Sequence, residues 1–402
     1  METWELAEQE DFESVLIATL TQGWTEQYGQ EFQVTPAAAS RPVQQWFLEP
    51  TLTTLYTKDV TRAVRRFMVD RFRFTPVTAR VPFQWLVGTA LGSRVRLCMN
   101  NRVVFSVDPP VPHAANVLIV PGSRRVRIFD FSAGFSRSLL KRGYPVEAVS
   151  NEVTVREGRA GPFPPLLRRA ADQTWFEEPI IDGYPLPRCP PWWPRQRYAT
   201  EILAALREWS SLEAEKVLAP RYAEELARRI SAGQAELLDR FRDVPLPDPA
   251  FLELLMEAAR STGKLELVQS HGDLQPGNIH IQRTPRRVFL IDWEYAARRS
   301  RAYDFLTYGL RARYPSGLGA RMLEFISQPA SGVAFQYLSL ASREERASSL
   351  ALFLLEDLER SISDSIHSPY KKLPYGFRLV CRELALAEGE LTKAFLRGRS
   401  VT

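Results

Sequence analysis

Cysteine is scarce in this 402-residue chain, and the three present, Cys98, Cys189 and Cys381, lie far apart. An odd number of cysteines without C-x-x-C spacing argues against a disulfide framework and against a zinc site, and it favours a reducing, cytoplasmic environment. The N-terminus also lacks a basic segment followed by an apolar core, so we expect no signal peptide.

Long hydrophobic runs are missing as well. The most apolar run, residues 81–91, contains Gln84 and is flanked by Arg80 and Arg94, so it is too short to span a bilayer and is expected to be a buried segment. With 45% hydrophobic and 25% charged residues, the composition is that of an ordinary globular protein with two or three domains.

The formal charge of +5 comes mainly from arginine, and it fits an anionic partner such as ATP. An expected helix over residues 53–73 carries four arginines: Arg62, Arg65, Arg66 and Arg71. Docking on an acidic membrane or a nucleic acid is the less favoured interpretation of this helix, and a solvated face is the favoured one. No RNA-binding motif accompanies the arginines, so no nucleic-acid partner is expected.

One stretch, Leu267 to Asp304, concentrates the chemistry. Asp273, Asn278 and Asp292 stand there among apolar residues that favour β-strands. The five residues between Gln282 and Val288 suit a hairpin loop, and closing that loop places Asn278 opposite Asp292. Residues directly opposite in an antiparallel pair share a face, so the amide and the carboxylate should converge.

Oxygen donors without thiolates favour magnesium over zinc, with phosphates completing the coordination shell. Asn278 and Asp292 are therefore the candidate Mg²⁺ ligands. Asp273 enters this hairpin on a loop, where its carboxylate could accept a proton from a substrate hydroxyl. The alternative is that these residues are simply turn formers, as Asp and Asn often are.

The wording H-G-D-L-Q-P-G-N followed by I-D-W-E-Y-A resembles the aminoglycoside phosphotransferase and choline kinase group. Its members look like protein kinases in fold, and His271, Asp273 and Asn278 match the H-R-D-x-x-x-x-N motif at the same spacing. The resemblance implies that Asp273 is the catalytic carboxylate, that His271 braces the loop, and that Asp292 binds the metal. The later Asp304 would brace the catalytic loop.

A change to period two after Arg94 predicts a hairpin around Asn100-Asn101 and then three strands, over residues 116–120, 125–131 and 136–141. By the resemblance these strands form a kinase-like N-lobe. The loop PGSRR would then cover the phosphates, with Arg124 or Arg125 supplying charge, but a plain β-turn is an equal alternative.

The resemblance also implies the nucleotide contacts. Lys141, at the end of the third strand, suits the lysine that holds the α and β phosphates. Glu152 lies closer than Glu147 to the apolar stripe of the next helix and is the preferred ion-pair partner of Lys141. The segment EEPIIDGYPL resembles the hinge, so adenine contacts are expected from the backbone around Glu178, Pro179 and Ile180.

The predicted fold is α+β: a bilobal, protein kinase-like fold with a small β-rich N-lobe and a larger helical C-lobe. We assign residues 1–105 to a mainly helical extension of unknown role, 106–186 to the N-lobe and hinge, and 187–402 to the C-lobe. The late helical segment FLLEDLERSISD offers Glu356, Asp357 and Asp364 to a cationic acceptor, although a solvated helix face is the favoured interpretation.

The expected activity is transfer of the γ-phosphate of ATP, with Mg²⁺, to a hydroxyl of a small molecule such as an amino sugar, a sugar, a choline-like alcohol or an aminoglycoside. One alternative is a kinase for a macromolecular or lipid-linked acceptor. Another is a nucleotide-binding pseudokinase that serves as an interaction module. The sequence defines neither the acceptor nor the oligomeric state.

Overall fold

The computed structural model describes residues 10–36, 44–49, 53–73, 81–93, 102–242, 244–261, 263–328, 332–338 and 340–396. The chain divides into two compact units. Unit 1 comprises Met1–Arg195 and His280–Ile291, and unit 2 comprises Gln196–Ile279 and Asp292–Thr402. Unit 1 carries most of the strands and unit 2 most of the helices, so the predicted α+β class with a β-rich first part and a helical second part is confirmed.

Unit 1 is built on a nine-stranded sheet in the order β1-β4-β2-β3-β5-β6-β7-β9-β8. Its strands are β1 (Gln33–Pro36), β2 (Gln44–Glu49), β3 (Thr54–Tyr56), β4 (Arg102–Asp108), β5 (Val117–Pro121), β6 (Arg125–Asp130), β7 (Phe135–Leu140), β8 (Arg168–Arg169) and β9 (Trp175–Pro179). The three strands expected over residues 116–141 are present as the antiparallel meander β5-β6-β7.

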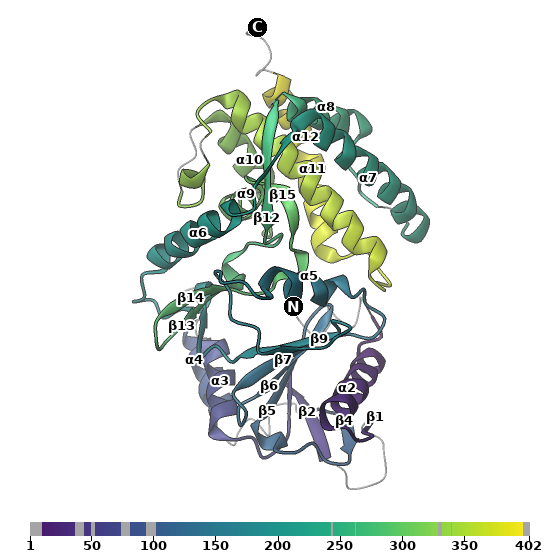
Figure 1. Ribbon diagram of the computed structural model, residues 1–402, viewed down its shortest axis with the longest axis vertical. Helices are drawn as coiled ribbons and strands as arrows, with labels where there is room; N and C mark the ends of the chain where they lie inside the picture. The colour runs from purple at the N-terminus through teal and green to yellow at the C-terminus, as the bar shows by residue number, and fades with distance from the viewer. Residues whose placement is uncertain are drawn as a thin grey trace. The chain divides into compact units, whose positions relative to one another are not determined.

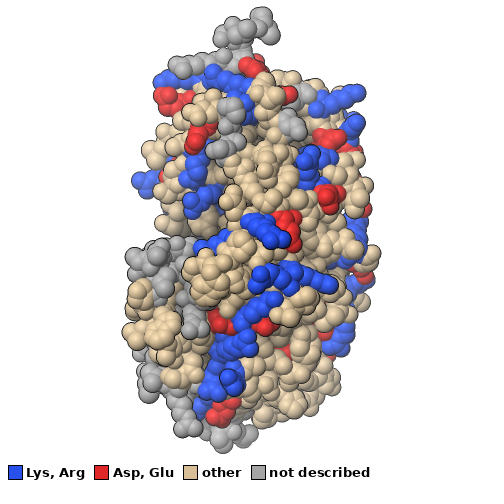
Figure 2. All heavy atoms as spheres, turned by 90° about the vertical axis from the view of Figure 1, so that its left-hand side faces the viewer, with Lys and Arg blue, Asp and Glu red and all other residues tan. Residues whose placement is uncertain are grey.

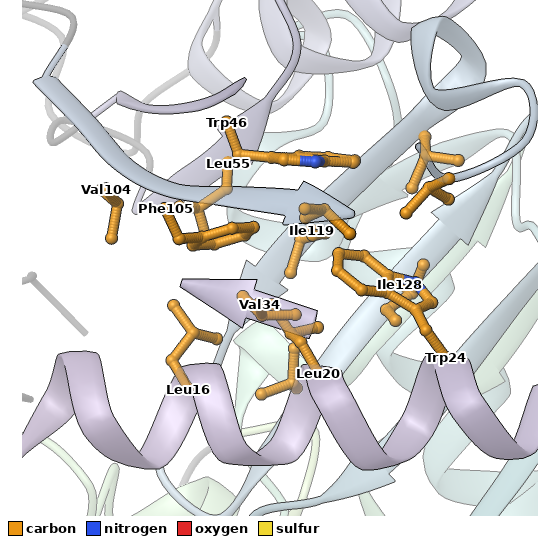
Figure 3. Close-up of a cluster of buried hydrophobic side chains, with 14 of the residues drawn as sticks. Leu16, Leu20, Trp24, Val34, Trp46, Leu55, Val104, Phe105, Ile119 and Ile128 are labelled. Atoms are coloured by element: carbon orange, nitrogen blue, oxygen red, sulfur yellow. The ribbon is translucent and has the colours of Figure 1, made fainter. Parts of the chain in front are cut away.

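Helices cover both faces of this sheet (Figure 1). On one face, α2 (Phe12–Tyr28) packs Leu16, Leu20 and Trp24 against strand residues that include Val126 and Ile128, as Figure 3 shows in part. On the other, α3 (Arg62–Arg73) contributes to a cluster with Leu118 and Phe129. Alternate residues of a strand point to opposite faces, which explains why Ile128 and Phe129 belong to different clusters.

The sequence boundary at residue 105 does not coincide with a structural one. It falls within β4, which pairs with β1 and β2, and β3 continues the sheet into β5 through the pair Leu55 and Ile119. The first hundred residues thus supply three strands, β1 to β3, as well as helices, and they share one core with the meander. The hairpin expected around Asn100-Asn101 lies outside the described residues.

The apolar run that we expected to be buried forms a surface helix, α4 (Val81–Gly92). Val87 faces inward, whereas Phe83, Trp85 and Leu86 are 65%, 55% and 64% exposed. Apolar composition alone overestimated the burial of this segment, because α4 packs mainly against α3.

The arginine-bearing helix begins at Arg62, and the strand β3 replaces its predicted first turns. Arg62 and Arg66 are exposed on α3, in agreement with a solvated face. Basic side chains outnumber acidic ones in the lower half of the face drawn in Figure 2. No helix in the described part of the chain combines the length and the apolar character needed to cross a bilayer.

Unit 2 contains α6 (Arg195–Ser211) almost entirely, α7 (Ala219–Arg240), α8 (Pro249–Arg260), α9 (Tyr303–Gly309), α10 (Leu318–Ser327), α11 (Arg343–His367) and α12 (Tyr375–Leu396). A small sheet accompanies them, with strands β11 (Glu215–Leu218), β12 (Lys264–Ser270) and β15 (Ala297–Ser300). Helix α11 packs against α7, α8 and α10. Its start is fixed by a capping box, in which Ser342 and Glu345 bond each other's backbone N–H groups.

Glu356, in the middle of α11, is 1% exposed. Its carboxylate accepts hydrogen bonds from the backbone N–H and the hydroxyl of Ser300, both at 2.6 Å, and from the Tyr222 hydroxyl at 2.9 Å. Burial raises its pKa to about 7, although these hydrogen bonds oppose the rise. Glu356 thereby connects α11 to β15 and α7.

We predict that Glu356 makes the stability of the protein depend on pH. Its pKa is higher in the folded than in the unfolded chain, so its contribution is fully present below pH 4.5 and is lost as the pH rises through about 7. The Glu356→Gln variant should lack this loss, which amounts to about 3 kcal/mol. Urea unfolding at pH 5 and pH 8 measures the difference, and identical pH dependence in both proteins would refute the prediction.

Candidate active site

The predicted catalytic loop, which contains Asp273 and Asn278, follows β12 directly and lies in unit 2. Gly272 has φ +83°, and a Cβ at this position would lie 2.1 Å from the carbonyl oxygen of Tyr295. Only glycine tolerates both the left-handed conformation and this close approach. The glycine of the H-G-D motif is therefore required by the path of the backbone.

Asp304 braces the loop, as the resemblance implied. Its carboxylate accepts hydrogen bonds from the backbone N–H groups of His271 at 2.7 Å and Gly272 at 3.0 Å, and from the Ser270 hydroxyl at 3.2 Å. His271 is fully buried, its ring lies 4.6 Å from that of Trp293, and its Nδ1 accepts the N–H of Asp273 at 3.2 Å. These contacts suit a bracing role for His271.

Both carboxylate oxygens of Asp273 are held by neighbouring side chains. Oδ1 accepts a hydrogen bond from Arg313 Nε at 2.6 Å, and Oδ2 accepts from Gln275 at 2.9 Å and from Asn278 Nδ2 at 3.1 Å. Asn278 Nδ2 also donates to the carbonyl oxygen of Asp273 at 2.9 Å. Asp273 and Asn278, which are five residues apart, are thus joined by two hydrogen bonds.

Arg313 is a site residue that the sequence analysis missed. Besides Asp273 it contacts Asp357, with Nη1 2.9 Å and 3.1 Å from the two carboxylate oxygens, and it donates to the Gly272 carbonyl at 3.0 Å. Arg360 and the Tyr303 hydroxyl complete the surroundings of Asp357. No sequence motif identified Arg313, because it lies forty positions after Asp273 and only folding brings the two residues together.

The charges in this network stabilise one another. Burial alone would raise the pKa of Asp357, but the positive charges of Arg313 and Arg360 hold it well below its usual range. Burial would likewise lower the pKa of Arg313, and the negative charges of Asp357 and Asp273 raise it instead. Because the pKa of Arg313 is raised, Arg313 remains charged near neutral pH, and Asp273 faces a permanent cation.

The interpretation of the α11 acidic residues as a solvated helix face is wrong for Glu356 and Asp357. Glu356 and Asp357 are 1% and 7% exposed, and each is surrounded by partners within the protein. Asp364 is partly buried and accepts the Tyr295 hydroxyl at 3.1 Å. Their internal partners make Glu356 and Asp357 structural groups rather than a binding surface for a cationic acceptor.

The two candidate metal ligands flank a hairpin. Asn278 directly precedes β13 (Ile279–Gln282), Asp292 lies two residues after the end of β14 (Arg287–Leu290), and the two strands are hydrogen-bonded neighbours. Asp292 has φ +73°, a conformation that is uncommon outside glycine and is often found at functional sites.

The donor set suits magnesium. The amide nitrogen of Asn278 is turned toward Asp273, which leaves its oxygen as the donor for a cation, and Asp292 offers a carboxylate. No group of three or more His, Cys, Asp or Glu side chains that could hold a metal occurs among the described residues. A cation held by one amide and one carboxylate would need phosphate and water oxygens to complete its shell.

The predicted ion pair between Lys141 and Glu152 is wrong. Lys141, which is 1% exposed, pairs with Glu10, and Tyr144 also donates to Glu10 at 2.7 Å. The reason is strand alternation: Leu139 faces α2, so Lys141, two positions later, points to the same face. Burial lowers the pKa of Lys141, while the negative charge of Glu10 opposes that shift. A phosphate-binding role for Lys141 stays a prediction.

Glu152 pairs with two arginines instead. Arg125 Nη1 lies 2.5 Å from its Oε2, and Arg156 bonds its other oxygen. Arg156 in turn donates to Glu178 at 2.7 Å. Glu152 belongs to α5 (Glu147–Arg156), the helix expected to carry the partner carboxylate, so the helix was predicted correctly and the cation was not.

The expected hinge residues Glu178 and Pro179 end β9, and Ile180 follows. The side chain of Glu178 pairs with Arg156, and an adenine contact through the backbone of Glu178 stays a prediction. The N–H of Ile180 already donates to the Gly134 carbonyl at 3.1 Å and so is not a donor for adenine. A contact at Pro179 stays a prediction.

Past the hinge, β10 (Gly183–Pro185) pairs with β13. A Cβ on Gly183 would lie 2.0 Å from the Ile281 carbonyl oxygen, so glycine is required there.

Comparison with known proteins identifies one matching family. Residues 190–332, about a third of the chain, match the phosphotransferase enzyme family known as APH. No curated protein matches the chain at a significant level.

Several solved structures are similar to parts of this chain at low sequence identity. A choline/ethanolamine kinase family protein from Mesorhizobium loti is 14% identical, covers 72% of this chain and 96% of its own, and gives a TM-score of 0.44. A Plasmodium vivax ethanolamine kinase is 13% identical, with 69% and 83% covered and a TM-score of 0.43. An aminoglycoside phosphotransferase APH(4)-Ia, in complex with ADP and hygromycin B, is 12% identical, with 71% and 95% covered and a TM-score of 0.40. The match over residues 190–332 includes the catalytic loop and confirms the resemblance of that segment to the phosphotransferase enzyme family.

Proposed function

We propose that this protein is an ATP-dependent phosphotransferase that moves the γ-phosphate to a hydroxyl group of a small molecule. The observation that carries the proposal is the arrangement of the catalytic loop. Asp273 and Asn278 are joined by direct hydrogen bonds on a loop that Asp304 holds by two backbone N–H groups. An interaction module with no chemistry to perform would not need a carboxylate oriented in this way.

The roles follow from the chemistry of each group. Asp273 orients the acceptor hydroxyl and accepts its proton as the bond to phosphorus forms. Asn278 and Asp292 hold Mg²⁺, which neutralises charge on the phosphates. Arg313 fixes one oxygen of Asp273, so the acceptor hydroxyl meets a carboxylate of defined orientation. Catalysis of this kind depends on positioning and charge neutralisation.

A lipid-linked acceptor is the second candidate, and one observation favours it. The large side chains Phe83, Trp85 and Leu86 of α4 are more than half exposed, and exposed apolar groups of this size often mark interaction surfaces. Deleting the first hundred residues cannot test this idea, since they supply three strands of the sheet in unit 1. A lipid-linked sugar therefore belongs in the acceptor panel below.

The first prediction concerns transfer itself. We expect label from γ-labelled ATP to appear in one class among amino sugars, simple sugars, choline, ethanolamine, nucleosides and a lipid-linked sugar. Asp273→Asn should abolish that transfer by removing the proton acceptor, while Mg-ATP affinity stays within about twofold. Strong residual transfer by the variant would mean that another group is the base, and tight Mg-ATP binding without any transfer would favour the pseudokinase.

The second prediction concerns the metal. Asp292→Asn keeps a residue that tolerates φ above zero, so it removes the charge without straining the backbone. We expect the gain in ATP affinity on adding Mg²⁺ to fall at least tenfold, with affinity in EDTA unchanged. Isothermal titration calorimetry measures both values, and an unaltered response to Mg²⁺ would exclude Asp292 as a ligand.

The third prediction concerns Arg313. Arg313→Gln leaves Asp273 and Asp357 without their shared cation, so the variant should lose about 3 kcal/mol of stability and at least tenfold in kcat, with Mg-ATP affinity retained. Arg360→Gln is the matched control, because Arg360 contacts Asp357 at 3.2 Å and is not bonded to Asp273. Equal losses of kcat in the two variants would show that Arg313 acts only through stability.

A further inference from the structure

Arg125 pairs with the helix to which the resemblance assigns the partner of the phosphate-binding cation. Arg125 is the first residue of β6 and ends a tight turn, in which the N–H of Gly122 donates a 2.8 Å hydrogen bond to the carbonyl oxygen of Arg125. Its guanidinium pairs with Glu152 of α5. We propose that Arg125, rather than Lys141, is the cation of unit 1 that contacts the phosphates of the bound nucleotide. This inference rests on the proposed function.

The two faces of the sheet decide between the two cations. Leu140 and Phe176 pack with Val149 and Val153 of α5, so they define the α5 face. Arg125 lies on this face, since its guanidinium carbon is 5.7 Å from the centre of the Phe176 ring. Lys141 belongs to the opposite face, which α2 covers.

Strand β7 offers no cation to the α5 face. By alternation its residues on that side are Ser136, Ser138 and Leu140, whereas Arg137 points with Leu139 toward α2 and bonds Gln27 there. Ser138 is fully buried, and its hydroxyl has no hydrogen-bond partner in the part of the chain that the structure describes. On the neighbouring strand β6, alternation brings Arg125 and Arg127 to this face, and Arg125 is the one that pairs with Glu152, beside Arg156 of α5.

Lys141 is already committed elsewhere. Its ammonium is buried against Glu10, whose other oxygen accepts the Tyr144 hydroxyl. Moving the ammonium to a phosphate would leave the Glu10 carboxylate buried without its cation, and such an uncompensated charge is strongly destabilising. We assign this pair the structural role of joining the start of α2 to the end of β7.

Arg125 is buried as well, but its carboxylate partner has a second cation. Glu152 shares its carboxylate between Arg125 and Arg156, so it keeps Arg156, which also pairs with Glu178, when Arg125 turns toward a ligand. A guanidinium also carries five N–H donors in a planar fork, which allows it to hold a carboxylate and phosphate oxygens together. Glu152 thus lies on the helix predicted to carry the partner carboxylate, but its cation is Arg125 instead of Lys141.

The test measures binding of Mg-ATP and of adenosine by isothermal titration calorimetry, with thermal unfolding of each protein. Arg125→Gln removes the charge, and Arg125→Lys restores it. The double variant Glu10→Gln/Lys141→Met removes both members of the other pair, so no buried charge is left alone. Arg142→Gln is the matched control, because Arg142 is exposed and adjacent to Lys141.

We expect Arg125→Gln to weaken Mg-ATP binding by about 10- to 100-fold while adenosine binding stays unchanged, as loss of a charge-assisted contact to phosphate predicts. Arg125→Lys should recover most of the affinity, and the double variant and the control should bind Mg-ATP as the wild type does. Unchanged Mg-ATP affinity in Arg125→Gln would overturn the inference. Equal losses for ATP and adenosine, or a loss confined to the double variant, would overturn it too. A wild-type protein that binds no ATP would instead refute the proposed function, and this inference with it.

Discussion

A buried charged side chain needs a partner of opposite charge, and this constraint determines the ion pairs around the candidate site residues in both units. In unit 2, Arg313 lies against Asp273 and Asp357, and Arg360 supplies the second cation that Asp357 needs. In unit 1, Glu152 and Glu178 share Arg156, and Glu10 holds Lys141. Because the cost of an unpaired ion in the interior is several kcal/mol, these pairings define which side chains remain for substrate.

The second constraint is the alternation of a β-strand, and it separates groups that are neighbours in sequence. Leu140 and Lys141 point to opposite faces of the nine-stranded sheet. Leu140 faces α5, the helix that carries Glu152, and Lys141 therefore points away from it. The same alternation brings Arg125 to that helix from another strand. The phosphotransferase resemblance implies an ion pair between a cation and a carboxylate of that helix. In the structure the carboxylate is Glu152, and Arg125 on β6 is paired with it.

Much of the fold could be predicted from local patterns. The helical part expected over residues 187–402 is present as α6 to α12. These helices show strong apolar periodicity, which tertiary packing only confirms. The prediction failed where packing partners decide: α4 is apolar yet half exposed, and residues 54–56 form a strand because β2 and β5 pair with them on either side.

The sequence by itself determined the catalytic loop, because its groups lie close along the chain. Asp273 and Asn278 are five residues apart, Asp292 follows one hairpin later, and local geometry suffices to relate them. Only the tertiary structure decided the partners that come from afar: Arg313 for Asp273, Glu10 for Lys141, and Arg125 for Glu152. Those pairings depend on the facing of strands and the packing of helices, which no local spacing encodes.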